Sequence, residues 1–134
     1  MTDQTRQDEP GVVTKLSPRS VGDTVARLTG LLAAKGVQVF AMIGQRAAAR
    51  TAGLELRETV LVIFGNPAAG TPVMAAAPLA ALDLPLKVLI WDDQGQAKVT
   101  YYAPAALAAR HHLDADLAAK LAIVDPLTDA LVAP

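Results

Sequence analysis

The sequence predicts an α+β fold, in which helices pack on one face of a single sheet. The first observation is the order of the apolar segments, which alternate between strand-like and helix-like periodicity as β-α-β-β-α-β-β-α. The second is composition: 52% of the 134 residues are hydrophobic and 19% are charged, which is typical of one compact domain. We therefore expect a single domain over residues 11–134, preceded by a disordered polar tail at 1–10.

The domain is expected to begin with a strand and then the most clearly marked helix of the chain. The segment "GVVTKLS" alternates in the manner of a strand. Ser20 can cap the helix that follows, and Gly36, a residue suited to a left-handed conformation, can end it. The apolar stripe of this helix has the spacing i, i+4, i+7, i+11 and consists of Val21, Val25, Leu28 and Leu32.

Two apolar segments, Val37–Ile43 and Thr59–Phe64, predict strands that are buried on both faces or nearly so. The connection between them, "GQRAAARTAG", predicts a short helical turn with Arg46 and Arg50 on one side. These two arginines are most simply explained as a solvated face. As the densest positive feature of the chain, they are also a candidate site for an acidic ligand or partner.

The second half of the chain is expected to contain a hairpin between helical segments. In order, the expected elements are short helices between Thr71 and Leu84, strands Leu86–Trp91 and Ala97–Tyr102 around the turn "DDQG", a helix from Pro104 to His111, and helical structure over 114–124.

Composition excludes several classes of function. Because the chain has no cysteine, it has no disulfide, no thiolate metal site and no cysteine nucleophile. A net charge of −1 without a broad basic patch argues against nucleic-acid binding, and the apolar runs are shorter than the ~18 residues of a membrane span. The first ten residues have no apolar signal-peptide core, so we expect a cytoplasmic protein. We also expect no metal and no cofactor.

The stretch "FGNPAAGTPVM" has nearly the glycine spacing of a nucleotide-binding P-loop. Gly65 and Gly70 are correctly spaced, but Thr71 stands where the phosphate-binding lysine belongs and Pro72 where the magnesium-binding hydroxyl belongs. We therefore interpret the stretch as a strand-to-helix corner that begins a helix at Thr71. The free amides of that helix start could still hold a small anion.

Two other pairs of polar residues are interpreted as structural. Asp92 and Asp93 fall in the expected hairpin turn, where aspartate is favoured by hydrogen bonding to the turn backbone. His111 and His112 are neighbours, and neighbours on a helix point in different directions, so they are expected at a solvated helix end without a shared metal.

Lys87, in the middle of an apolar strand, and Tyr101, across the hairpin, are more informative. A lysine at an alternating strand position most simply faces water. If that face is covered instead, Lys87 and Tyr101 would line a pocket with Asn66 and Asp83 nearby.

The succession "SVGDTVARLTGLLAAKGVQVF", "FGNPAAGTPVM", "LDLPLKVLIW" and "YYAP" resembles the bacterial and archaeal family called domain of unknown function 302, over Val12 to Leu113. The resemblance implies a single two-layer domain with an antiparallel sheet and helices packed on one face, similar to the TATA-box-binding-protein-like arrangement, and a homodimer. No biochemical activity is established for that family, so the function stays open. The positions that match are Phe64, Gly65, Asn66, Pro67, Gly70, Asp83, Leu84, Pro85 and Tyr101.

The chain departs from the family pattern in two places. Family members commonly carry Asp-His after the second strand, where this chain has Gly44 and Gln45. Their usual Tyr-Asn-Asp-Pro is Tyr101-Tyr102-Ala103-Pro104 here. If those polar groups serve a site in relatives, this chain has lost or altered it.

We therefore expect a non-enzymatic domain that binds a small ligand, such as a small anion, or a protein partner, and that acts as a homodimer. The hypothesised site consists of Gly65, Asn66, Gly70, Thr71, Asp83, Lys87 and Tyr101. One alternative is an enzyme of unassigned chemistry, which requires Lys87, Asp83 and Tyr101 to converge in a concave pocket. The other is a purely structural dimerisation module, which requires a flat apolar interface and no pocket of ligand size.

Overall fold

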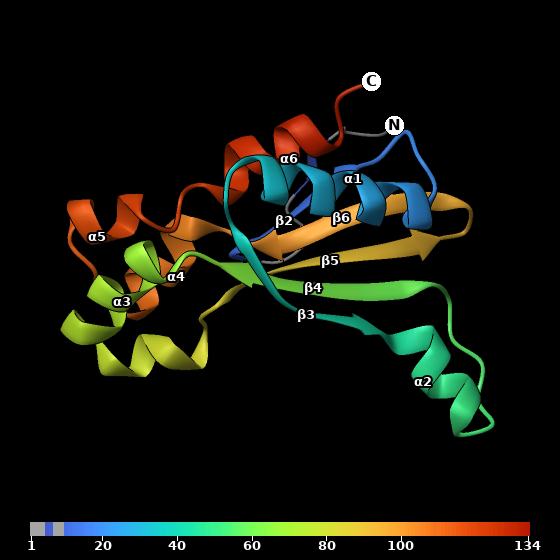
Figure 1. Ribbon diagram of the computed structural model, residues 1–134, viewed down its shortest axis with the longest axis horizontal. Coiled ribbons are helices and arrows are strands. Elements are labelled where there is room, and N and C mark those ends of the chain that lie inside the picture. Colours follow the sequence, from blue (N-terminus) through green and yellow to red (C-terminus); the bar gives the residue numbers. More distant parts are fainter. Residues whose placement is uncertain (1–4, 7–9) are drawn as a thin grey trace.

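The computed structural model describes residues 5–6 and 10–134, which form one antiparallel sheet with helices on one face (Figure 1). The strand order in the sheet is β1-β2-β6-β5-β4-β3. The strands are β1 (Thr5–Arg6), β2 (Val12–Leu16), β3 (Gln38–Gly44), β4 (Thr59–Gly65), β5 (Leu86–Asp93) and β6 (Gln96–Tyr102). Of the predicted polar tail, residues 5–6 form β1 and Pro10 is described, while the rest lies outside the described residues.

The helices occupy one face and both ends of the sheet. They are α1 (Val21–Ala34), α2 (Gln45–Thr51), α3 (Pro67–Ala76), the 3-10 helix η1 (Pro78–Leu82), α4 (Pro104–Arg110), α5 (Ala115–Ala119) and α6 (Val124–Leu131). Figure 1 shows α1 and α6 side by side over the sheet, α2 beyond one end, and α3, η1, α4 and α5 gathered at the other end. The predicted α+β class is confirmed.

The core lies between the sheet and the pair α1 and α6. Alternate residues of β4 and β5 point into it, and Val62, Phe64, Val88 and Ile90 have no exposed surface. Leu28 of α1 is also fully buried, as are other residues of the predicted apolar stripe and of α6. The alternate apolar side chains of the strands and the apolar stripe of α1 therefore pack together in one layer.

The signals at both ends of α1 are confirmed. The hydroxyl of Ser20 accepts a hydrogen bond from the backbone N–H of Asp23 at 3.0 Å, which satisfies one of the free amides of the first turn. Gly36, just after the helix, has a φ of +68°, in the left-handed region that favours glycine. The chain then turns directly into β3.

The prediction that the second and third strands are buried on both faces is wrong. β3 is an edge strand, and Phe40 and Met42 are 47% and 48% exposed. β4 is buried only on the face toward α1, while Leu61 and Ile63 on its other face are half-buried. The continuous apolar sequence indicated a covered sheet, but the helices of this domain cover one face only.

Two helix boundaries also differ from those predicted. α3 begins at Pro67, because Asn66 caps it, so Thr71 and Pro72 lie inside the helix and do not begin it. The expected helix over 114–124 is interrupted after α5, and the chain starts a separate helix, α6, at Val124. Pro126 in the first turn of α6 is the sequence signal for this second start.

Truncation of the core should be costly. We expect Leu28→Ala to lower the free energy of unfolding by about 3 kcal/mol, because it leaves a cavity between α1 and the sheet. Leu79→Ala is the matched control, since Leu79 is 72% exposed in η1 and its truncation should change stability by less than about 0.5 kcal/mol. Urea denaturation of both variants measures the difference, and equal losses would contradict this account of the core.

Candidate functional site

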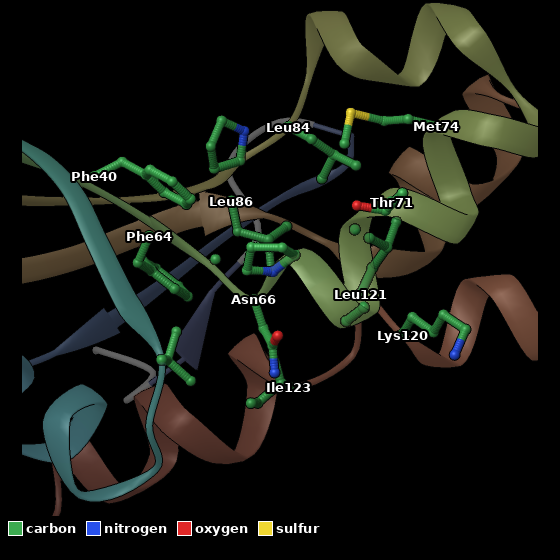
Figure 2. A pocket seen from close by; sticks show the side chains of 16 residues that line it. Phe40, Phe64, Asn66, Thr71, Met74, Leu84, Leu86, Lys120, Leu121 and Ile123 are labelled. Atoms are coloured by element: carbon green, nitrogen blue, oxygen red, sulfur yellow. The ribbon is translucent and has the colours of Figure 1, made fainter.

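The main candidate site is a cavity of about 240 Å³ at the end of the sheet where α3 begins (Figure 2). Its walls come from the ends of β4 and β5, from α3, and from the turn between α5 and α6. The lining residues are mostly apolar: Val37, Phe40, Phe64, Gly65, Asn66, Pro67, Ala69, Gly70, Thr71, Met74, Leu84, Pro85, Leu86, Lys120, Leu121 and Ile123. A small apolar or amphipathic molecule fits a cavity of this kind.

Asn66 holds the corner between β4 and α3 in place. Its side-chain oxygen accepts from the N–H of Ala68 at 2.9 Å, and its backbone oxygen accepts from Ala69 and Gly70, each at 2.9 Å. These three amides are therefore used inside the chain. Thr71 lies within α3 and not at its start, so the amides after Thr71 are not the free amides of a helix start on which the expected small-anion site depended.

A bulge in β3 directs Phe40 toward the cavity. The register between β3 and β4 shifts between Val39 and Ala41, which leaves Phe40 as the extra residue. Gly65 is the reason that its ring comes so close: a Cβ at Gly65 would lie 3.3 Å from Phe40 Cε2 and 3.4 Å from Pro85 Cβ. Phe40 and Pro85, which form this part of the cavity wall, thus pack directly against the backbone of Gly65.

The structure brings only part of the hypothesised site together. Gly65, Asn66, Gly70 and Thr71 line the cavity. The other three, which are Asp83, Lys87 and Tyr101, are not among the lining residues. The signature stretch therefore supplies one wall of the candidate site, and the polar trio that the enzyme alternative requires does not share it.

Asp83 belongs to an ionic cluster with α4. His111 Nε2 lies 2.6 Å from Asp83 Oδ2, and Arg110 Nη1 donates to the same oxygen at 3.2 Å. Burial raises the pKa of Asp83, but His111 and Arg110 outweigh it and hold that pKa below its ordinary value. Only 9% of the His111 side chain is exposed, so the expectation that the histidines lie at a solvated helix end is wrong for His111.

Lys87 lies near this cluster, but its ammonium group bonds to backbone oxygens and not to the Asp83 carboxylate. Its ammonium donates to the backbone oxygens of Pro85 at 3.2 Å and Asp83 at 3.5 Å. Its side chain is half-buried on the face of β5 that points away from α1 and α6, whereas Tyr101 points into the core. Lys87 and Tyr101 thus lie on opposite faces of the sheet.

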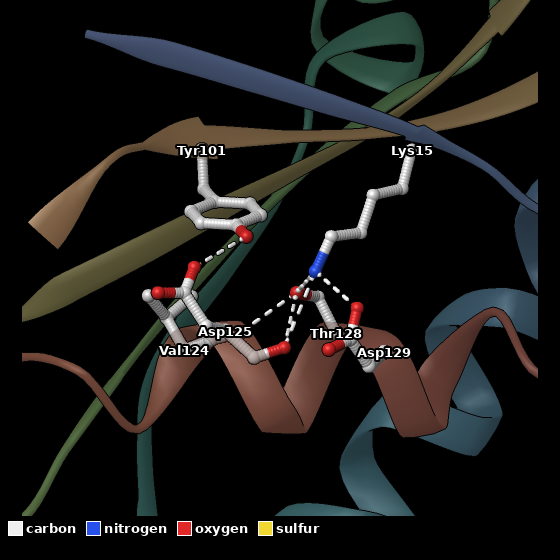
Figure 3. A network of polar contacts seen from close by, with 6 residues as sticks. All are labelled: Lys15, Tyr101, Val124, Asp125, Thr128 and Asp129. Carbon is white, nitrogen blue, oxygen red and sulfur yellow. Dashed lines mark hydrogen bonds and ion pairs between the residues drawn. The ribbon is translucent and has the colours of Figure 1, made fainter. Parts of the chain in front are cut away.

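Tyr101 takes part in a partly buried network that the sequence did not reveal (Figure 3). Its hydroxyl donates to Asp125 Oδ1 at 2.7 Å. Lys15, only 5% exposed, donates to Thr128 Oγ1 and Asp129 Oδ1, both at 2.7 Å, and lies 5.3 Å from the centre of the Tyr101 ring. These contacts attach β2 and β6 to α6.

Burial and partners shift both titratable groups of this network. Burial by itself lowers the pKa of Lys15, but hydrogen bonds involving Asp129 and Tyr101 outweigh it, and the pKa lies above its ordinary value. Burial raises the pKa of Tyr101, with a further rise from Asp125 and an opposing effect of Thr128 and Lys15. At neutral pH the lysine is charged and the tyrosine neutral, an arrangement suited to holding α6 in place.

The two arginines of the weaker candidate site lie far from the cavity. Arg46 and Arg50 are on α2, at the opposite end of the sheet from α3 (Figure 1). Arg46 is half-buried and Arg50 exposed. Among residues 5–6 and 10–134, no group of three or more His, Asp and Glu side chains is placed to hold a metal ion.

Sequence reasoning missed several residues of the cavity wall. Phe40 was assigned to a buried strand, and only the bulge directs it to the cavity. Lys120 and Ile123 were placed on a continuous helix, whereas they lie in the turn between α5 and α6. The signal for that turn was Pro126, which marks a new helix start.

Comparison with known proteins identifies the family to which the fold belongs. The family model described as "Domain of unknown function DUF302" matches residues 13–131. The crystal structure of an uncharacterised conserved DUF302 protein from Bacillus stearothermophilus is similar with a TM-score of 0.78 and 20% identity, over 92% of this chain and 97% of that one. This level of identity supports the fold alone.

Curated relatives carry a different name. Over 106 residues, or 78% of this chain, it is 41% identical to proteins named fluoride-specific ion channel FluC 1 from Brucella suis and Brucella abortus. The matched part covers 42% and 39% of those proteins, so the chain spans about two fifths of their length. In the described part of this chain, no helix is both long enough and apolar enough to cross a membrane.

The Asp83 cluster should contribute stability that depends on pH. We expect Asp83→Asn to lower the free energy of unfolding by about 1.5 kcal/mol at neutral pH, because it removes the charge that pairs with His111 and Arg110. Since the folded-state pKa of Asp83 is depressed, the contribution is present above the unfolded carboxyl pKa of about 3.9 and is lost as pH falls through the lower folded value.

Chemical denaturation of wild type and Asp83→Asn at a series of pH values measures this effect. Asp116→Asn is the control, because Asp116 is exposed in the first turn of α5. Its loss should cost less than about 0.5 kcal/mol at any pH. A difference between wild type and Asp83→Asn that persists undiminished at about pH 2 would contradict the assignment.

Proposed function

The chain belongs to the DUF302 family, and we propose that its function is to bind a small, largely apolar molecule in the cavity at the end of the sheet, without chemical reaction and as a homodimer. The cavity carries this proposal. A volume of about 240 Å³ is slightly below the usual range for ligand pockets and suits a molecule smaller than a typical drug. Its apolar walls favour transfer of such a molecule out of water.

The positions of the polar groups favour binding over catalysis. Asp83 is engaged with His111 and Arg110, and Tyr101 with Asp125. Lys87 lies on the other sheet face from Tyr101. A general acid and base must reach the same reacting atom, and the three residues of the enzyme alternative do not converge on a common cavity.

The uncovered sheet face supports the homodimer. Ile43, Leu61 and Leu89 are direct cross-strand partners on the face opposite α1, with Trp91 close by on β5. Ile43 is 38% exposed and the other three side chains are half-buried. A second copy of the chain would cover this apolar band, and a two-fold contact brings the same band of both copies together.

Filling the cavity should abolish ligand binding. Octan-1-ol is a suitable neutral probe, and at ten times its dissociation constant it should stabilise wild type by about 1.4 kcal/mol, seen as a rise in melting temperature. Ala69→Leu adds bulk to the cavity wall and should remove this rise. Ala75→Leu is the control, because Ala75 is an exposed residue of the same helix, and it should respond as wild type does.

Sodium fluoride, compared with sodium chloride, is the second probe in this experiment because of the name of the Brucella relatives. The proposal predicts no specific fluoride effect and an octan-1-ol effect that Ala69→Leu removes. A fluoride-specific rise with no response to octan-1-ol would overturn it.

The dimer should depend on the apolar face of the sheet. We expect wild type to sediment as a dimer and Ile43→Lys as a monomer with an unchanged circular dichroism spectrum, because a dimer would bury the new ammonium group without a partner. Leu82→Lys introduces the same charge at a leucine that is 79% exposed in η1 and should leave the dimer intact. A monomeric wild type, or a dimeric Ile43→Lys, contradicts this assignment.

A further inference from the structure

Three polar side chains, those of Asn66, Thr71 and Lys120, are among the residues that line the cavity. In Figure 2, Asn66 and Lys120 lie on the side formed by the start of α3 and the turn between α5 and α6, whereas Phe40 and Leu84 lie on the opposite side. Thr71 lies on α3 and, like Asn66 and Lys120, is exposed. The cavity is therefore amphipathic, with an apolar wall and a polar rim.

All three polar side chains of this rim can donate hydrogen bonds. The side-chain oxygen of Asn66 is already used by the N–H of Ala68, which leaves its NH₂ group as the free end. Thr71 has a hydroxyl, and Lys120 has an ammonium group on a flexible stem. A ligand group that suits this rim is one that accepts hydrogen bonds.

The charge of the rim is positive. Lys120 is the single charged side chain among the described residues that line the cavity. No carboxylate of the described residues forms an ion pair with Lys120. Its stem contributes to the apolar wall while its ammonium group can reach solvent at the edge. An anionic group at the rim would supply the counter-charge.

The size of the cavity limits the apolar part of the ligand. With about 30 Å³ for each water-sized or methylene-sized group, 240 Å³ accommodates roughly eight such groups. We propose that the ligand is a monoanionic amphiphile, such as a medium-chain or aromatic carboxylate, with its apolar body in the cavity and its carboxylate at Lys120. This inference rests on the proposed small-molecule binding function and adds the chemical class of the ligand.

The experiment compares three probes of eight carbon atoms each: octanoate, in which the eighth carbon is the carboxylate carbon, octan-1-ol and octylammonium. Calorimetric titration of wild type should give octanoate a dissociation constant about fivefold below that of octan-1-ol, and octylammonium should bind most weakly. The preference for octanoate should shrink as salt is raised, because the rim charge is exposed to solvent.

Lys120→Met removes the charge and keeps most of the apolar stem. It should weaken the binding of octanoate about fivefold more than it weakens the binding of octan-1-ol. Lys35→Met is the matched control, because Lys35 is exposed after α1 and does not line the cavity, and it should alter neither affinity.

The outcomes separate the two proposals. If octan-1-ol binds and Ala69→Leu blocks it, but octanoate binds no more tightly or Lys120→Met leaves octanoate unchanged, the carboxylate inference is wrong and the small-molecule function stands. If none of the three probes binds wild type, the binding function of the cavity fails as well.

Discussion

One-sided burial of an antiparallel sheet is the constraint on which the rest of this structure depends. Alternate residues of β4 and β5 lie on the face toward α1 and α6, and four of them, Val62, Phe64, Val88 and Ile90, have no exposed surface. A shift of register by one residue would exchange this face for the half-buried one. Phe64 and Leu86, which are cross-strand partners, are the last residues of the buried face and line the cavity. The cavity is therefore the end of the core, beyond the reach of the two covering helices.

The attachment of α6 determines where the core stops. Lys15 and Tyr101 reach from the sheet to the first two turns of α6, and the charged and hydrogen-bonded contacts fix how that helix lies on the sheet. The turn that leads into α6 contributes Lys120, Leu121 and Ile123 to the cavity wall. One segment of the chain, from Lys120 to Asp129, thus contributes first to the cavity wall and then to the partly buried polar network.

Much of the fold could be predicted from local sequence. The Ser20 cap, the stripe on α1 and the alternation in the hairpin strands are encoded within a few residues of where they act, and the structure confirms them. The exposure of β3 could not be predicted in this way, because the position of a strand in the sheet order depends on pairing with distant segments. The pairing of Asp83 with His111, 28 residues apart, is of the same kind.

The candidate site was predicted in part for the same reason. Four of the predicted residues lie in one continuous stretch of sequence, so they are also close together in the structure. They are Gly65, Asn66, Gly70 and Thr71. Phe40 and Lys120 come from a bulge and a turn whose geometry is set by tertiary packing, and local periodicity assigned both to regular elements. Lys87 and Tyr101 appeared close in the hairpin, but alternation places them on opposite faces of the sheet.

Gly65 has a consequence for the range of molecules that the cavity can accept. Because Gly65 has no side chain, the Phe40 ring and Pro85 can both approach the β4 backbone closely. A single methyl group there would push one of these two walls outward by a few tenths of an ångström, and Phe40, 47% exposed on an edge strand, is the freer of the two to move. The residue at position 65 thus determines the size of molecule that fits. One added carbon atom at the end of β4 would change the width of the cavity, while the strand register in the core stays the same.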